Sequence, residues 1–151
     1  MTLVEAIKKA RRVYLIGNGG SAANAIHLAN DLISCGIKAH ALTADVATLT
    51  AIANDFGYEH IFSRQIDVLG EPGDLLIALS GSGNSPNIIK ALVAASKIGM
   101  DTFSVVGDFG KSAAPALSIS CVSTGTSMQD AENLQLDVGH RAMLAIKKAA
   151  A

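Results

Sequence analysis

Short apolar runs alternate along the chain with longer segments in which apolar residues recur every three or four positions. The short runs are rich in Val, Ile and Leu and predict strands over residues 13–16, 37–42, 75–79, 102–106 and 117–122. Helical spacing predicts helices over residues 21–33, 46–53, 59–69, 86–99 and 129–148. Because each parallel crossover needs a covering helix, this alternation predicts an α/β protein, with a doubly wound five-stranded parallel sheet and helices on both faces. We expect one domain over residues 1–151, since the composition does not change along the chain.

Two glycine- and serine-rich loops follow the first and third predicted strands, at residues 17–21 (GNGGS) and 80–85 (SGSGNS). Doubly wound sheets bind ligands beyond the carboxyl ends of their strands, where both loops lie. Ser21 is expected to cap the first long helix, and Pro86 suits the first turn of a later one. Neither loop has the spacing of the common nucleotide-binding motifs.

These loops have the features of a phosphate site. Glycine lets backbone N–H groups approach a ligand, and the following helix adds unpaired N–H groups with a partial positive charge. The three serines of the second loop add neutral hydroxyl donors. The alternative interpretation is that both loops are only tight turns between a strand and a helix.

The composition narrows the choice of ligand. The 12 basic and 13 acidic residues nearly cancel and Trp is absent, so we expect neither nucleic acid nor an acidic membrane as a partner. Cys35 and Cys121 lack the spacing of a disulfide framework or a zinc knuckle, which favours a reducing cytoplasm. The charged N-terminus is unlike a secretory peptide, and no apolar run approaches the roughly 18 residues of a membrane span. We therefore expect a cytoplasmic protein with a small polar ligand.

Several strings resemble one known family: GNGGS (17–21), ANDFG (53–57), IFSRQ (61–65), PGD (72–74) and SGNS (82–85). The chain resembles the sugar isomerase (SIS) domain over nearly its whole length, and in particular the phosphoheptose isomerase branch. The resemblance implies a flavodoxin-like strand order and a homotetramer with sites shared between subunits. It also implies conversion of sedoheptulose 7-phosphate to D-glycero-D-manno-heptose 7-phosphate, for the heptose of bacterial lipopolysaccharide. Members usually begin with a long helical arm before the first strand. In this chain only residues 1–10 correspond to that arm.

The same resemblance implies the site residues. Those implied to contact the substrate are Asn18, Gly19, Gly20, Ser21, Asn54, Asp55, Ser80, Gly81, Ser82, Ser85 and Glu132. Of these, Ser80, Ser82 and Ser85 are implied to hold the phosphate. The implied catalytic pair is Asp31, on the helix after the first loop, and His140, on the last helix.

Isomerisation of a ketose phosphate requires a base that removes a proton from one carbon and returns it to the neighbouring carbon. We expect Asp31 to be this base and His140 to be its acid/base partner. The chain departs from the family at two of these positions, with Asp31 where Glu is usual and Glu132 where Gln is usual. The shorter Asp31 side chain ends about 1.5 Å further from a substrate.

A metal ion is a second use of the same residues. Some members of the family bind zinc at positions that match His27, Asp31, Glu132 and His140. His27 and Asp31 are four residues apart and therefore share a helix face. The alternative is that His27 lies at a helix interface and His140 in solvent, with no ion between them.

Three functions remain open from the sequence. The first is the isomerisation of sedoheptulose 7-phosphate. The second is a non-catalytic SIS module that binds sugar phosphate or another protein, which the departures at Asp31 and Glu132 favour. The third is the isomerisation of another phosphosugar, because the loops recognise phosphate rather than chain length.

Overall fold

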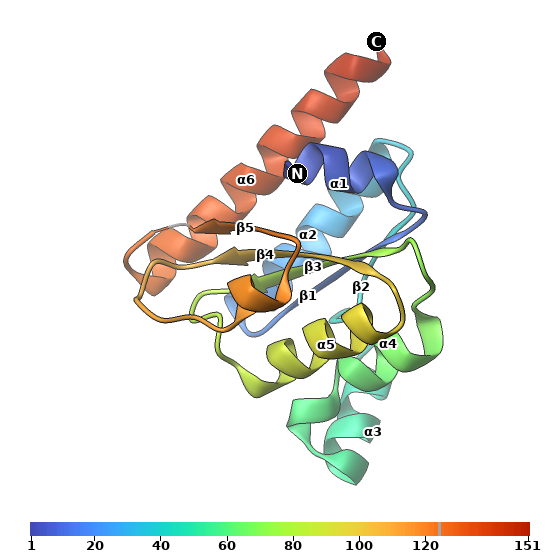
Figure 1. Ribbon diagram of the computed structural model, residues 1–151, viewed down its shortest axis with the longest axis vertical. Helices are drawn as coiled ribbons and strands as arrows, with labels where there is room; N and C mark the ends of the chain where they lie inside the picture. Colours follow the sequence, from blue (N-terminus) through green and yellow to red (C-terminus); the bar gives the residue numbers. More distant parts are fainter. Residues whose placement is uncertain (124) are drawn as a thin grey trace.

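The computed structural model describes residues 1–123 and 125–151. Helices and strands alternate through most of the chain, as the apolar pattern predicts (Figure 1). The elements are α1 (Leu3–Lys9), β1 (Val13–Gly17), α2 (Gly20–Ser34), β2 (Ala39–Ala41), α3 (Val46–Phe56), η1 (Tyr58–His60), α4 (Ser63–Leu69), β3 (Leu75–Ser80), α5 (Pro86–Lys97), β4 (Asp101–Val106), η2 (Ala114–Leu117), β5 (Ser120–Ser123) and α6 (Met128–Ala150).

The strands form one sheet of five in the order β2-β1-β3-β4-β5, and every neighbouring pair is parallel. This is the flavodoxin-like order. From β1 the chain first adds β2 on one side, and then returns to add β3, β4 and β5 on the other side. Gly17 of β1 is paired with Leu79 of β3. The two loops therefore leave neighbouring strands at one edge of the sheet, at the switch point where such folds bind ligands.

The side chains of each central strand alternate between two separate cores. On β1, Val13 and Leu15 pack with α1, α2 and α6, whereas Tyr14 and Ile16 pack with α4 and α5. Figure 1 shows the first group of helices on one side of the sheet and α3, α4 and α5 on the other. The predicted α/β architecture, a parallel sheet covered by helices, is confirmed.

The structure corrects three local predictions. Ser21 is not a cap, because α2 starts one residue earlier and its N-cap is Gly19, whose φ of 57° suits glycine. The helix predicted over residues 59–69 is divided into η1 and α4, and Ile61 and Phe62 are buried at the break. The strand predicted over residues 117–122 begins only at Ser120, since Pro115 and its neighbours form η2.

The starts of α3 and α5 carry residues that are common at helix starts. Asp45 caps α3 by accepting a hydrogen bond from Thr48 N, and Pro86 is in the first turn of α5, as predicted. Hydrogen bonds from the Thr48 hydroxyl and N–H lower the pKa of the Asp45 carboxyl. None of the helices in the described part of the chain is both long and apolar enough to cross a membrane.

Candidate active site

A pocket of about 120 Å³ lies where β1 and β3 end, between their two loops and the start of α6. Its lining consists of Asn18, Ser21, Ser80, Gly81, Ser82, Ser85, Met128 and Glu132. All of these except Met128 are among the residues implied to contact substrate. Gly19 and Gly20 belong to the same first loop. The structure thus brings together loops that are about sixty residues apart in the sequence.

The helix that follows the second loop begins without a side-chain cap. Ser85 is the N-cap of α5, yet its hydroxyl accepts no hydrogen bond from the helix, and the first turn carries no acidic residue. By contrast, α1, α3 and α6 have side-chain caps, for example Ser127 in α6. In the first turn Pro86 has no N–H and Ile88 N donates to Asn87 Oδ1, so α5 offers an anion its partial positive charge and the N–H of Asn87.

Two hydroxyl groups of the second loop accept hydrogen bonds from the backbone of the same loop. Ser80 Oγ accepts a hydrogen bond from Gly83 N at 3.0 Å, and Ser82 Oγ accepts one from Asn84 N at 3.2 Å. Gly83 has a φ of 64°, which requires glycine in practice. Because both hydroxyls act as acceptors within the loop, their hydrogens remain free to donate to a phosphate oxygen.

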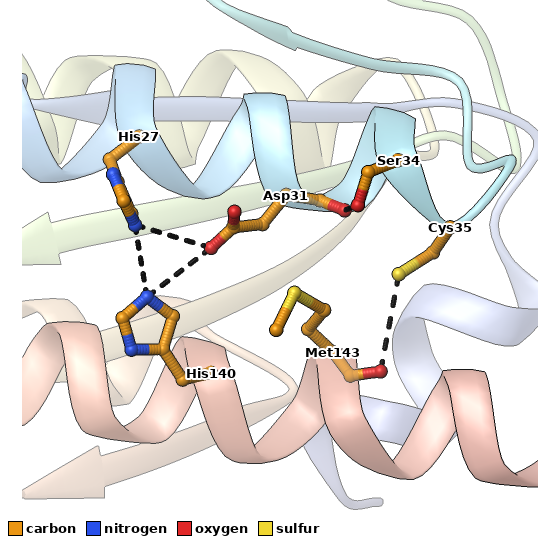
Figure 2. A network of polar contacts seen from close by, with 6 residues as sticks. All are labelled: His27, Asp31, Ser34, Cys35, His140 and Met143. Carbon is orange, nitrogen blue, oxygen red and sulfur yellow. Dashed lines mark hydrogen bonds and ion pairs between the residues drawn. The ribbon is translucent and has the colours of Figure 1, made fainter.

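A second polar group lies between α2 and α6 (Figure 2). His27 and Asp31 are one turn apart on α2, and His140 faces them from α6. Oδ2 of Asp31 lies 3.3 Å from Nε2 of each histidine, and the two Nε2 atoms are 2.9 Å apart. This Oδ2 is buried and receives no hydrogen bond from the residues that the structure describes. We call these three residues the His/Asp cluster.

Close packing of α2 against α6 forms the His/Asp cluster. The buried Asn24 side chain on α2 donates hydrogen bonds to the carbonyl oxygen of Glu132 and to Oε1 of Gln135. Gly139 lies directly against Leu28, and a Cβ at residue 139 would collide with that leucine. The small residue lets the helices approach closely, so that His140, the next residue along, reaches Asp31.

Known proteins share both the sequence and the fold. Residues 1–107 match the family model described as "SIS domain". A phosphoheptose isomerase from Chlorobaculum parvum is 40% identical over 147 residues, which cover 91% of this chain and 70% of the relative. The chain belongs to the phosphoheptose isomerase branch of the SIS-domain family. The phosphoheptose isomerase from Rhodospirillum rubrum is 39% identical over 89% of this chain and 74% of its own length.

Solved structures of phosphoheptose isomerases have the same fold as this SIS-domain protein. The enzyme from Neisseria gonorrhoeae superimposes with a TM-score of 0.85 at 33% identity, over 97% of this chain and 81% of that one. The enzyme from Francisella tularensis gives a TM-score of 0.86 at 28% identity, over 96% and 82%.

Two residues implied to contact the substrate lie apart from the pocket, and a third lies apart from the His/Asp cluster. Asn54 and Asp55 are exposed at the end of α3, where Asn54 Nδ2 donates to Asp55 Oδ1 at 3.0 Å, and neither lines the pocket. Glu132 lines the pocket but is not part of the His/Asp cluster. It is eight residues from His140 on α6, about 12 Å along the helix axis.

Three further residues at the site were not predicted from the sequence, namely Met128, Asn87 and Tyr58. Met128 lines the pocket and packs against Gly81, where any Cβ would collide with its sulfur. Asn87 is only 2% exposed and bonds to Asn18, and Tyr58 bonds to Asn18 as well. Asn87 could have been found, because it is a polar residue on the face of α5 that otherwise buries Ile88, Ala91 and Leu92.

A substitution at Gly20 tests where the Glu132 side chain lies. The Glu132 carboxylate lies against Gly20, and a Cβ there would collide with it. Because this carboxylate is the far end of a flexible side chain and can turn aside, we expect Gly20→Ala to lower the free energy of unfolding by at most about 1 kcal/mol, the low end of the cost of overpacking. Urea denaturation measures this loss. Combining Gly20→Ala with Glu132→Ala should recover most of it relative to Glu132→Ala alone, and a loss of equal size in both backgrounds would contradict the contact.

Proposed function

We propose that this protein is an aldose–ketose isomerase that converts sedoheptulose 7-phosphate to D-glycero-D-manno-heptose 7-phosphate through an enediolate. The observation that carries the proposal is the pocket at the switch point, where an uncapped, acid-free helix start meets three serine hydroxyls. The similarity to proteins named phosphoheptose isomerase supports the choice of substrate. The family implies a role in bacterial heptose synthesis.

Binding of the phosphate is assigned to the second loop. The hydroxyls of Ser80, Ser82 and Ser85 would donate to the phosphate oxygens, and the start of α5 would supply partial positive charge. At the start of α2 the Glu132 carboxylate is already present, so the phosphate is better placed at α5. The first loop would then contact the sugar through Asn18, Gly19, Gly20 and Ser21.

Proton transfer is assigned to the His/Asp cluster. Asp31 would remove a proton from C1 of the ketose, which gives an enediolate, and would return it to C2, which gives the aldose. His140 would move the hydroxyl proton from the oxygen on C1 to the oxygen on C2. Substrate and product are isomers, so no other reactant is needed.

The His/Asp cluster also fits a zinc ion. Four ligands at about 2.0–2.1 Å in a tetrahedron are roughly 3.3 Å from one another, and Asp31 Oδ2 lies 3.3 Å from both Nε2 atoms. In the described part of the chain the buried Oδ2 has no hydrogen-bond donor, which leaves it available as a ligand. His27, Asp31 and His140 would hold the ion, while Glu132 lies outside this group. Zinc would supply positive charge that stabilises a developing oxyanion.

A zinc titration tests this role. We expect His140→Ala to weaken zinc binding at least 100-fold, since one of three ligands is lost, as measured by competition with a chromogenic chelator. His60→Ala is the matched control, because His60 is on η1 and outside the His/Asp cluster. Equal zinc affinity in both variants would remove the metal role and leave the acid/base role of His140 standing.

The activity itself is tested with purified protein and sedoheptulose 7-phosphate. We expect heptose 7-phosphate to appear in the NMR spectrum, and we would run the reaction with and without zinc. A panel of pentose and hexulose phosphates shows whether the protein isomerises another phosphosugar in place of sedoheptulose 7-phosphate. The absence of turnover under all of these conditions would overturn the proposed reaction.

A non-catalytic sugar-phosphate-binding module is the second candidate. One observation favours it: Asp31 does not line the pocket that contains the second loop. Such a module would bind sedoheptulose 7-phosphate without exchanging its C1 hydrogen with solvent deuterium. This candidate would be rejected if the wild type exchanges the C1 hydrogen in D₂O and the Asp31→Asn variant does not.

Association into a homotetramer with shared sites is also part of the proposal. No side chain of α3 is buried, and large apolar residues are exposed on and near it, namely Val46, Phe56, Val68 and Leu69. Asn54 and Asp55 lie on the same helix and away from their own pocket, as expected if they serve a neighbouring subunit. Light scattering that gave a monomer at assay concentration would contradict shared sites.

A further inference from the structure

Asn18, at the end of β1, is held by two residues with no role assigned so far. Its Oδ1 accepts a hydrogen bond from the Tyr58 hydroxyl at 2.9 Å and another from Asn87 Nδ2 at 2.7 Å. Its Nδ2 donates to Asn87 Oδ1 at 2.9 Å. The two amides thus form a reciprocal pair, and Tyr58 adds a third bond to it.

The orientation of both amides is fixed by a backbone group. The N–H of Ile88 donates to Asn87 Oδ1 at 3.0 Å. A backbone N–H can only donate, so the oxygen of Asn87 must face it, and the nitrogen of Asn87 must face Asn18. The oxygen of Asn18 therefore faces Asn87 and Tyr58, because the opposite orientation would bring donors against donors.

Within residues 1–123 and 125–151, these contacts leave Asn18 with one unused hydrogen-bonding group. The carbonyl oxygen of an amide has two lone pairs, and Tyr58 and Asn87 occupy both. The amide nitrogen has two hydrogens, of which Asn87 takes one. Asn18 lines the pocket, so it offers a ligand there only an N–H donor.

We propose that Tyr58 and Asn87 are positioning residues that hold Asn18 as a single N–H donor to an acceptor oxygen of the bound sugar phosphate. The inference rests on the proposed function of the pocket. Buried Asn87 sets the orientation, whereas Tyr58 is 59% exposed on η1 and acts only through its hydroxyl. Tyr58 thereby connects the segment after α3 to substrate binding.

Removal of the Tyr58 hydroxyl tests the proposal. Loss of one hydrogen bond to Asn18 should weaken binding of sedoheptulose 7-phosphate in Tyr58→Phe about three- to tenfold in calorimetry. KM should rise by the same factor, with kcat within about twofold because the His/Asp cluster is untouched. Tyr14→Phe is the matched control, since it removes a hydroxyl that bonds to Leu69 O and lies outside the pocket, and its affinity should equal that of the wild type.

A double-mutant cycle separates positioning from direct contact. In an Asn18→Ala background Tyr58→Phe should have no further effect on affinity, because the group it positions is gone. An effect that persists there, or no effect in the wild type, would overturn the proposal, whether or not the protein isomerises the sugar. Failure of the wild type to bind sedoheptulose 7-phosphate would instead overturn the proposed function.

Titration with inorganic phosphate identifies the oxygen that Asn18 binds. If Tyr58→Phe weakens sugar phosphate alone, the acceptor is a sugar oxygen. If it weakens inorganic phosphate as well, the acceptor is a phosphate oxygen. Thermal melting of each variant checks that a loss of affinity does not come from unfolding. Because Tyr58 is exposed, we expect Tyr58→Phe to melt at the same temperature as the wild type.

Discussion

Replacing Asp31 by asparagine is expected to lower kcat for sedoheptulose 7-phosphate by about 1,000-fold, within the range for loss of a general base. Asparagine has the same shape but does not accept a proton from carbon. KM should change by less than about threefold, because Asp31 does not line the pocket that holds the phosphate loop. The measurements are NMR turnover and exchange of the C1 hydrogen in D₂O, which should fall together.

The control for this variant is Asp101→Asn. Asp101 is at the start of β4, at the opposite edge of the sheet from the loops, and pairs with Lys9 at 2.8 Å. Removing its charge should leave kcat within about twofold. If Asp31→Asn keeps both turnover and exchange, the base is elsewhere, and Glu132, the carboxylate that does line the pocket, becomes the residue to replace.

The architecture follows from local patterns in the sequence. Each apolar run of the central strands had to be buried on both faces, and each crossover needed a helix, so the parallel sheet was predictable. The pairing of Gly17 with Leu79 confirms that the two loops end neighbouring strands. The ends of strands and helices were less predictable. For example, the N-cap of α2 is Gly19 and not Ser21, which was the expected cap.

The site was only partly predictable, because pairs of residues on different helices are set by packing. The resemblance implied His27, Asp31, Glu132 and His140 together, yet Asn24 and Gly139 fix the contact of α2 with α6 so that only three of them meet. The role of Tyr58 was not predictable at all. A hydroxyl that reaches Asn18 from forty residues away leaves no periodic signal in the sequence.

Replacing Ser85 by aspartate is expected to separate stability from binding. Aspartate is a good N-cap, and the serine there makes no capping bond, so the free energy of unfolding should rise by about 0.5–1 kcal/mol. The same carboxylate would face a phosphate of charge about −2. At an effective dielectric constant of about 40 and a separation of about 4–5 Å, this repulsion is roughly 3–4 kcal/mol, or more than 100-fold in affinity.

Ser85→Ala provides the reference, because it removes the hydroxyl without adding charge and should weaken binding only about tenfold or less. Calorimetry with sedoheptulose 7-phosphate and urea denaturation of the same samples measure both effects. A rise in stability with a loss of affinity means that the uncapped start of α5 serves the ligand and not the fold. If Ser85→Asp still binds the sugar phosphate as Ser85→Ala does, the phosphate lies elsewhere, and the start of α2, which follows the first glycine loop beside Glu132, becomes the next position to test.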